Sequence, residues 1–167
     1  MNCVIKIGNI TAPNLTSGSI VKISPYTAGP DMAWSFVVST LEIGSIRGSG
    51  SNNNITGLHL LPNSSYSGAT LSLNKIFVRE ISNCQKGLYL EASQNIVSNW
   101  IECLTISSCK YAVRLDSTGG TIRGNQINAG FFDGSAISND YGAYLSAGNN
   151  NTFTLTSLGG YDPGKTL

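Results

Sequence analysis

The chain carries little charge, and that charge is balanced. Only 11% of its 167 residues are Asp, Glu, Lys or Arg, and 10 basic against 9 acidic side chains give a formal net charge of +1. The basic residues form no run, so the positive surface that neutralises the phosphates of a nucleic acid is missing. Disorder is excluded as well, because 41% of the residues are hydrophobic. The composition predicts one folded domain that does not bind nucleic acid.

Long apolar runs and clusters of metal ligands are also missing. No stretch reaches the roughly 18 apolar residues of a membrane span, and the opening MNCVIKIGNITAPN lacks the charged and apolar regions of a signal peptide. We therefore expect neither a membrane span nor a signal peptide. His59 is the single histidine and has no cysteine near it in the sequence, so no metal site and no cofactor are predicted.

What the chain does have is an internal repeat. Within each copy, apolar residues occupy the second and fourth positions after the start, and then the seventh. This change of phase indicates a strand that bends and continues. The aligned segments, with starts 35, 25, 26 and 26 residues apart, are STLEIGSI from Ser39, NKIFVREI from Asn74, NWIECLTI from Asn99, NQINAGFF from Asn125 and NTFTLTSL from Asn151.

Two further strands complete each repeat. A small residue followed by alternating apolar residues recurs in TGLHLLPN, KGLYLEAS, YAVRLDST and YGAYLSAG. A third apolar site lies three residues before each of the first four starts, at Phe36, Leu71, Ile96 and Ile122. A unit of about 25 residues with three bends cannot bury its apolar side alone, so copies of it must stack into a solenoid.

The start of the repeat is Asn in four consecutive copies: Asn74, Asn99, Asn125 and Asn151. Asn suits a tight bend because it tolerates left-handed backbone angles, and stacked amides can hydrogen-bond from one coil to the next. The predicted fold is therefore all-β, a parallel β-helix of about five coils with an Asn ladder. We expect irregular strands or a partial coil over 1–35, the β-helix over 36–158 and a tail over 159–167.

These features resemble a known family. A ladder of Asn at a two-residue bend after TLSL, NIVS and TIRG is similar to the right-handed parallel β-helix of pectate-lyase-like proteins. The Gly/Ser/Asn-rich turns and the phrases ISNCQKGLYLEAS and GTIRGNQINAG most resemble bacteriophage tailspikes of that superfamily. The resemblance covers roughly 36–158 and carries no catalytic signature. It implies a right-handed helix, a homotrimer, a bacterial surface polysaccharide as partner, and a place in the virion or outside the cell.

A candidate site lies on the outer face of the second strand. If the leucines of GLYLE point inward, then His59, Tyr89, Arg114 and Tyr144 point outward and stack along the helix. One step further along, Glu91 and Asp116 place two carboxylates on neighbouring coils, which resembles the carboxyl pair of a retaining glycosidase. We predict that Glu91 and Asp116 are the catalytic acid and the nucleophile or base, and that the four stacked residues bind sugar. The alternative is that both acids are solvated turn residues balanced by Arg114.

A second outward set follows the Asn bend. It contains Lys75, Trp100, Gln126, Phe77, Glu102, Asn128, Arg79 and Glu80. Exposed aromatic rings on adjacent coils need a partner, which can be a sugar ring or a neighbouring subunit. The resemblance to trimeric tailspikes favours the subunit contact, and sugar stacking is the alternative, so Trp100 is also a candidate sugar-binding residue.

Three functions remain open. The first is a fragment of a phage tailspike that binds, with or without cleaving, a surface polysaccharide. The second is a free polysaccharide lyase or hydrolase, which the missing signal peptide and the missing cluster of calcium-binding Asp disfavour. The third is a non-catalytic β-helical shaft. A chain that ends in GGYDPGKTL directly after a coil is expected to be part of a longer protein.

Two of the four cysteines are predicted to stack. Cys84 and Cys109 each lie three residues past an inward Ile in consecutive coils, at a strand spacing of about 4.8 Å. Parallel side chains do not approach closely without strain, so reduced thiols that act as small apolar residues are favoured over a disulfide.

Overall fold

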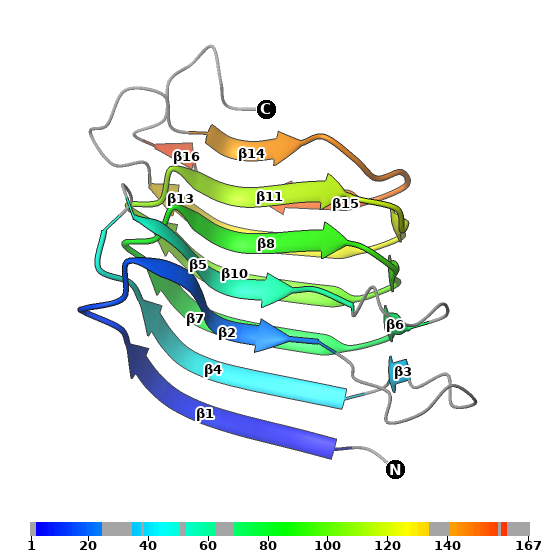
Figure 1. The fold of residues 1–167 in the computed structure, drawn as a ribbon, viewed down its shortest axis with the longest axis horizontal. Coiled ribbons are helices and arrows are strands. Elements are labelled where there is room, and N and C mark those ends of the chain that lie inside the picture. The colour runs from blue at the N-terminus through cyan, green and yellow to red at the C-terminus, as the bar shows by residue number, and fades with distance from the viewer. Residues whose placement is uncertain are drawn as a thin grey trace.

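The computed structural model of the protein describes residues 3–24, 35–37, 39–50, 53–62, 69–133, 141–156 and 158–159. Regular structure in these residues is β-strand throughout, and none of them forms a helix long and apolar enough to cross a membrane. The strands form three parallel sheets, and the chain contributes one strand to each sheet in turn. Figure 1 shows the chain rising coil by coil from β1 at one end to β14 at the other.

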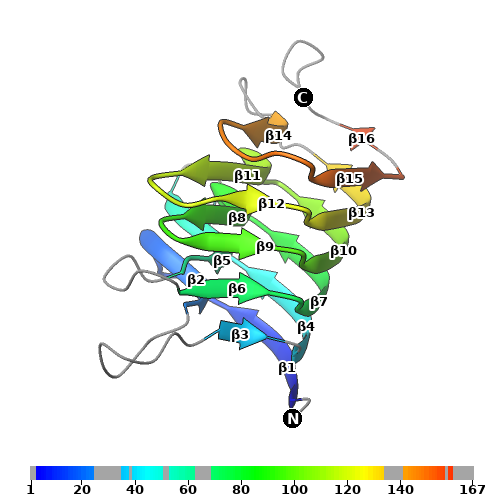
Figure 2. The same cartoon turned by 90° about the vertical axis from the view of Figure 1, so that its right-hand side faces the viewer.

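The first sheet has seven strands. Its strands are β1 (Cys3–Thr11), β4 (Ser39–Arg47), β7 (Lys75–Ser82), β10 (Trp100–Ser107), β13 (Gln126–Asp133), β15 (Thr152–Leu155) and β16 (Leu158–Gly159), the last of which pairs with β13 beside β15. The second sheet has five strands, β2 (Ser17–Ile23), β5 (Asn54–Leu60), β8 (Lys86–Ala92), β11 (Tyr111–Ser117) and β14 (Tyr141–Leu145). The third sheet, seen face-on in Figure 2, has β3 (Ser35–Val37), β6 (Thr70–Ser72), β9 (Asn95–Val97) and β12 (Ile122–Arg123).

The chain visits the three sheets in a fixed order, which makes the fold a parallel β-helix. Four coils run from β1 to β12, and β13 with β14 begins a fifth. The predicted register is confirmed, because Ile101 of β10 lies opposite Ile76 and Ile127, and Ile96 of β9 lies opposite Leu71 and Ile122. The predicted all-β solenoid of about five coils is therefore correct.

The first two strands lie in the same sheets as the later coils. β1 pairs in parallel with β4, and β2 pairs in parallel with β5. Residues 25–34, within the predicted irregular segment 1–35, lie outside the described residues, as does the predicted tail from residue 160 onward.

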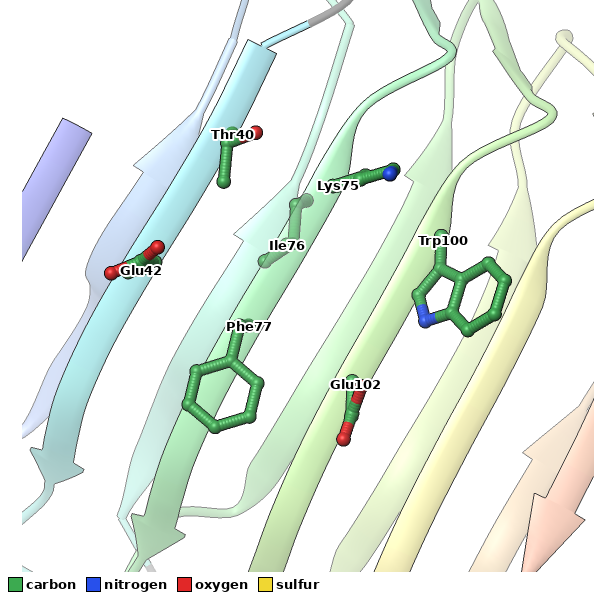
Figure 3. A pocket seen from close by; sticks show the side chains of 7 residues that line it. All are labelled: Thr40, Glu42, Lys75, Ile76, Phe77, Trp100 and Glu102. Carbon is green, nitrogen blue, oxygen red and sulfur yellow. The ribbon is translucent and has the colours of Figure 1, made fainter. Parts of the chain in front are cut away.

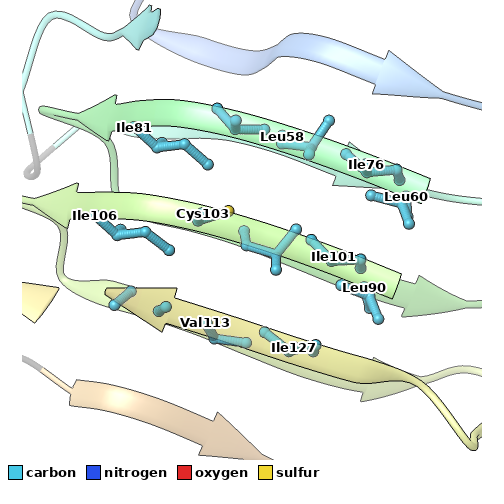
Figure 4. Close-up of a cluster of buried hydrophobic side chains, with 14 of the residues drawn as sticks. Leu58, Leu60, Ile76, Ile81, Leu90, Ile101, Cys103, Ile106, Val113 and Ile127 are labelled. Atoms are coloured by element: carbon cyan, nitrogen blue, oxygen red, sulfur yellow. The ribbon is translucent and has the colours of Figure 1, made fainter. Parts of the chain in front are cut away.

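The core fills the space between the sheets. Figure 4 shows side chains from the first and second sheets, among them Ile101, Ile106, Leu58 and Leu90, which are less than 2% exposed. Burying each such side chain stabilises the fold by about 1.5–3 kcal/mol. Ile5 continues the column of Leu41 but is 39% exposed, because β1 has no further coil beside it among the described residues. The apolar side chains of β1 therefore stay partly open to solvent at this end of the stack.

The small residue that recurs before each inward leucine is explained by close packing. A Cβ atom added to Gly87 would lie 2.6 Å from Cγ2 of Ile106 and 2.7 Å from the carbonyl oxygen of Ala112. Gly57 meets the equivalent atoms of Ile81 and Gly87 one coil earlier. The second strand therefore turns too close to the first for a larger side chain at this position.

The Asn ladder is confirmed in detail. Nδ2 of Asn74 donates to Oδ1 of Asn99 at 2.9 Å, and Nδ2 of Asn99 donates to Oδ1 of Asn125 at 2.9 Å. Asn125 continues the ladder to Asn151 at 3.0 Å. Each of the acceptor oxygens also takes a backbone N–H from the coil before it. Buried amides that are satisfied in this way tie every coil to the next.

The bend itself differs from the sequence-based expectation in one respect. We expected the ladder Asn to tolerate the left-handed backbone, but the left-handed residue is the one before it. Two residues connect the third sheet to the first after β6, β9 and β12, namely 73–74, 98–99 and 124–125. The first of each pair has positive φ: 54° at Leu73, 55° at Ser98 and 63° at Gly124. This turn directs the following Asn side chain into the stack.

Replacing Asn99 with Ala tests the ladder. The variant loses hydrogen bonds to both neighbouring coils and leaves the backbone N–H of Asn74 and the carbonyl of Leu71 without this partner. We expect a loss of about 2–5 kcal/mol in the free energy of unfolding, measured by urea titration. Asn95→Ala, at an exposed position of β9, is the control and should cost little. Equal losses in the two variants would contradict a structural role for the ladder.

Candidate functional site

The outer face of the second sheet carries a row of large side chains. His59, Tyr89, Arg114 and Tyr144 lie opposite one another in consecutive strands, as the sequence predicted, and Lys22 of β2 precedes them. We call these five residues the outer row. Their side chains contact one another rather than standing free, so the chemistry of each depends on its neighbours.

His59 forms a hydrogen-bonded chain across three coils. Its Nδ1 lies 2.9 Å from Oγ of Ser19 on β2, and its Nε2 lies 3.0 Å from Oε2 of Glu91 on β8. The ring stacks on Tyr89 with centroids 4.7 Å apart, and His59 is 8% exposed. Burial lowers the pKa of His59 below its ordinary value, and the nearby Glu91 opposes this shift without reversing it. His59 is therefore a neutral imidazole at neutral pH.

Asp116 is the centre of a second network. Its Oδ2 accepts hydrogen bonds from Nε of Arg114 at 2.7 Å and from the hydroxyl of Tyr89 at 3.0 Å, and its Oδ1 accepts one from Ser146. Burial alone would raise the pKa of Asp116, but the hydrogen bonds from Ser146, Arg114 and Tyr89 hold it below its usual range. Burial and the bond to Asp116 raise the pKa of Tyr89. The pair is thus an ionised carboxylate and a neutral phenol.

Arg114 lies among tyrosine rings. Its guanidinium carbon is 5.0 Å from the ring centre of Tyr111 and 5.2 Å from that of Tyr144, and Tyr141 stacks on Tyr111 at 5.2 Å. Sequence reasoning missed Tyr111 and Tyr141. They begin the phrases YAVRLDST and YGAYLSAG, so a Tyr at the same place in two repeats was the signal that could have shown them.

Glu91 and Asp116 lie opposite each other on β8 and β11, as predicted, but their partners differ. Glu91 contacts His59, whereas Asp116 contacts Arg114. Although Glu91 lies opposite, the hydrogen bonds to Asp116 hold the pKa of its carboxyl below the usual range. The assignment of the two acids as catalytic groups stays a prediction.

A groove lies on the outer face of the first sheet. It has a volume of about 540 Å³ and is lined by Thr40, Glu42, Lys75, Ile76, Phe77, Trp100 and Glu102, which Figure 3 shows on three adjacent strands. Glu42, Phe77 and Glu102 lie opposite one another in register, and Trp100 lies opposite Lys75. We call this feature the Trp100 groove. Sequence reasoning placed Lys75, Phe77, Trp100 and Glu102 together but missed Thr40 and Glu42 from the earlier coil.

The groove differs from the outer row in its exposure. Trp100 is 46% exposed, whereas Tyr89 is 7% exposed. Glu42 pairs with Lys6 at 2.8 Å on the open surface, where an ion pair contributes little. Glu102 has no ion-pair partner among the described residues. The groove therefore presents aromatic surface and carboxylate oxygens to solvent.

The part of the chain that the structure describes has no group of three or more His, Cys, Asp or Glu arranged to hold a metal ion. Cys84, Cys103 and Cys109 are buried and form no disulfide, as the sequence favours for Cys84 and Cys109. Burial raises the pKa of Cys103 to about 12, so this thiol stays protonated.

Comparison of the chain with protein-family models, with curated proteins and with solved structures found no match. The three parallel sheets and the Asn ladder define the architecture as a parallel β-helix without identifying a family.

The Asp116 network gives a prediction about acid stability. Because the pKa of Asp116 is lowered in the folded state, its carboxylate stabilises the fold at pH values above the ordinary pKa of 3.8. This contribution is lost as the pH falls through the lower pKa of the folded state. At pH 7, Asp116→Asn should lower the free energy of unfolding by about 1–3 kcal/mol. The difference from wild type should shrink as the pH is lowered from 5 to 2, measured by urea titration. Glu42→Gln, at an exposed ion pair, should change stability little at either pH. A wild-type advantage that persists at pH 2 would contradict this account.

Proposed function

We propose that this chain is a module of a tailspike-type protein and that it binds a bacterial surface polysaccharide in the Trp100 groove. The observation that carries the proposal is the exposure of Trp100 beside Phe77 on the open face of the first sheet. Apolar surface that is contiguous and exposed is a feature of interaction sites, and Trp100 and Phe77 line one groove together.

The composition of the groove suits a sugar. A pyranose ring has an apolar C–H face that can lie on Trp100, and hydroxyl groups around its edge that need hydrogen-bond partners. Glu42 and Glu102 supply acceptors, and Lys75 supplies a donor. A groove of about 540 Å³ lies within the size range of small-ligand sites.

The β-helix also suits a polymer. Successive strands repeat side-chain positions about every 4.8 Å, so a sugar chain laid across the coils meets equivalent positions on each one. The fold and the resemblance of the turns to those of phage tailspikes together support a place in a phage tail or outside the cell. They also support a homotrimer as the assembled form.

We place the sugar in the groove and not on the outer row because of exposure. His59 and Tyr89 are buried, and their polar atoms are bonded within the chain. Tyr144 is 37% exposed and could contact a ligand directly. The sugar-binding role of His59, Tyr89, Arg114 and Tyr144, and cleavage by Glu91 and Asp116, remain predictions from sequence.

Glycan binding by two variants of β10 tests the proposal. Trp100→Ala removes the exposed ring and should weaken binding by about tenfold or more, since an apolar contact worth 1.4 kcal/mol or more is lost. Leu104→Ala removes an equally exposed side chain, 42% against 46%, that does not line the groove, and should leave binding unchanged. The ligands are a panel of bacterial capsular polysaccharides and lipopolysaccharides, with affinities measured by surface plasmon resonance. Binding that is equal in both variants, or absent from the wild type across the panel, would overturn the proposal.

A second candidate function is a non-catalytic shaft whose first sheet contacts neighbouring subunits. The observation in its favour is that Leu104, exposed on the same strand as Trp100, extends the apolar surface beyond the groove. Such a contact would repeat around a three-fold axis in the proposed homotrimer.

Light scattering distinguishes the two uses of this surface. If subunits cover it, the wild type should be a trimer at high micromolar concentration, and Trp100→Glu should be monomeric because a charge is forced into the contact. Ser17→Glu, at an exposed position of β2 on the second sheet, is the control because it changes the net charge by the same amount. A monomeric wild type would exclude the subunit contact in this chain and leave Trp100 to the glycan.

A further inference from the structure

We propose that Ser19, His59 and Glu91 form a Ser–His–Glu relay that hydrolyses small carboxylic esters, with Ser19 as the nucleophile. The proposal is independent of glycan binding in the Trp100 groove, because the relay lies on the second sheet. It rests on three side chains from three successive coils that are joined by two hydrogen bonds of 2.9 and 3.0 Å.

The hydrogen bonds fix the direction of the relay. A carboxylate only accepts, so Glu91 takes the N–H of Nε2 and leaves the lone pair of His59 on Nδ1. Nδ1 then accepts the hydroxyl proton of Ser19. A nucleophile, a base and a group that orients the base, each within hydrogen-bond reach of the next, is the arrangement that activates serine.

The state of His59 fits the role of a base. Burial, helped by the positive charges of Lys22 and Lys86, lowers the pKa of the imidazole, so His59 is unprotonated at neutral pH. Stacking on Tyr89 holds the ring in place. Ser19 itself is partly exposed and can be reached by a substrate, whereas the base behind it is shielded from water.

Two cationic side chains act on His59 and favour negative charge near the relay. Lys22 lies opposite His59 on β2, three residues after Ser19, and Lys86 lies on β8, where both lower the pKa of the imidazole. A polar groove of about 410 Å³, lined in part by Lys22, Glu91, Ser93 and Thr118, lies at the Glu91 end of the relay. These features favour esters over amides, because an ester needs less stabilisation of its leaving group.

The reaction proceeds in two balanced steps. Oγ of Ser19 bonds to the ester carbonyl carbon while its proton passes to Nδ1 of His59, and collapse of the intermediate breaks the C–O bond of the alcohol, which leaves with that proton. Water then adds to the acyl-serine, again giving its proton to Nδ1, and the carboxylic acid leaves as Oγ of Ser19 regains the proton. The sum is ester plus water to alcohol plus acid, with no other reactant.

The experiment uses the whole chain with 4-nitrophenyl acetate and a fluorophosphonate probe. The wild type should hydrolyse the ester and carry the probe on Ser19, located by mass spectrometry. Ser19→Ala should lose both the label and the hydrolysis above the buffer rate. Ser17→Ala, two residues earlier on the same exposed strand, should keep both. Thermal unfolding of each variant shows that the fold is retained.

The pH profile tests the relay itself. His59→Gln should lower the rate by about 10²–10⁴-fold. Wild-type hydrolysis should rise with an apparent pKa below the 6.5 of an ordinary His, and Glu91→Gln should move that pKa lower still, because Glu91 favours the protonated ring. A wild-type rate no higher than that of Ser19→Ala, or a label on a residue other than Ser19, would overturn the proposal. An unchanged pH profile in Glu91→Gln would remove Glu91 from it.

Discussion

Hydrogen bonds between consecutive coils are the interaction on which the rest of this protein depends. No single coil can bury its own apolar side, and the strands of one coil have no partners except the coils next to it. The Asn ladder adds a side-chain hydrogen bond to the backbone pairing at the same bend of each coil. Because the ladder allows one register only, it also decides which side chains enter the core and which meet on the outer faces.

The two outer faces use that register in different ways. On the second sheet, neighbouring coils place unlike groups opposite each other. The ring of His59 stacks on Tyr89, and the guanidinium of Arg114 lies over the same tyrosine ring. On the first sheet, Glu42, Phe77 and Glu102 lie opposite one another without bonding to each other, and apart from the Lys6–Glu42 ion pair the surface stays open. The first face therefore leaves its aromatic and carboxylate groups accessible, whereas the groups of the second face are held by contacts inside the chain.

The fold could be predicted from sequence because its rules are local and repeated. Ile101, Asn99 and Ile96 stand at fixed offsets in consecutive copies, and any parallel stack of such copies brings them into columns. The contents of the site were harder to predict. The bond between Ser19 and His59 joins residues 40 positions apart, through a first coil whose sequence matches the repeat poorly. The residues of the outer row were placed in the correct register. The burial of His59 and Tyr89 could not be predicted, because it follows from how their side chains pack on each other and not from the spacing of the repeat.

The two-residue bends before the first sheet have a consequence for how the molecule can vary. Connections between the second and third sheets differ widely in length, from two residues at 93–94 to eleven at 24–34, and those between the first and second sheets also vary, from three residues at 83–85 to seven at 134–140. Only the bends at 73–74, 98–99 and 124–125 are constant. Added polypeptide can therefore be accommodated along both borders of the second sheet, where a new loop would change the surroundings of the outer row. One residue added at a ladder bend would instead break the stack of amides and shift the register of every later coil.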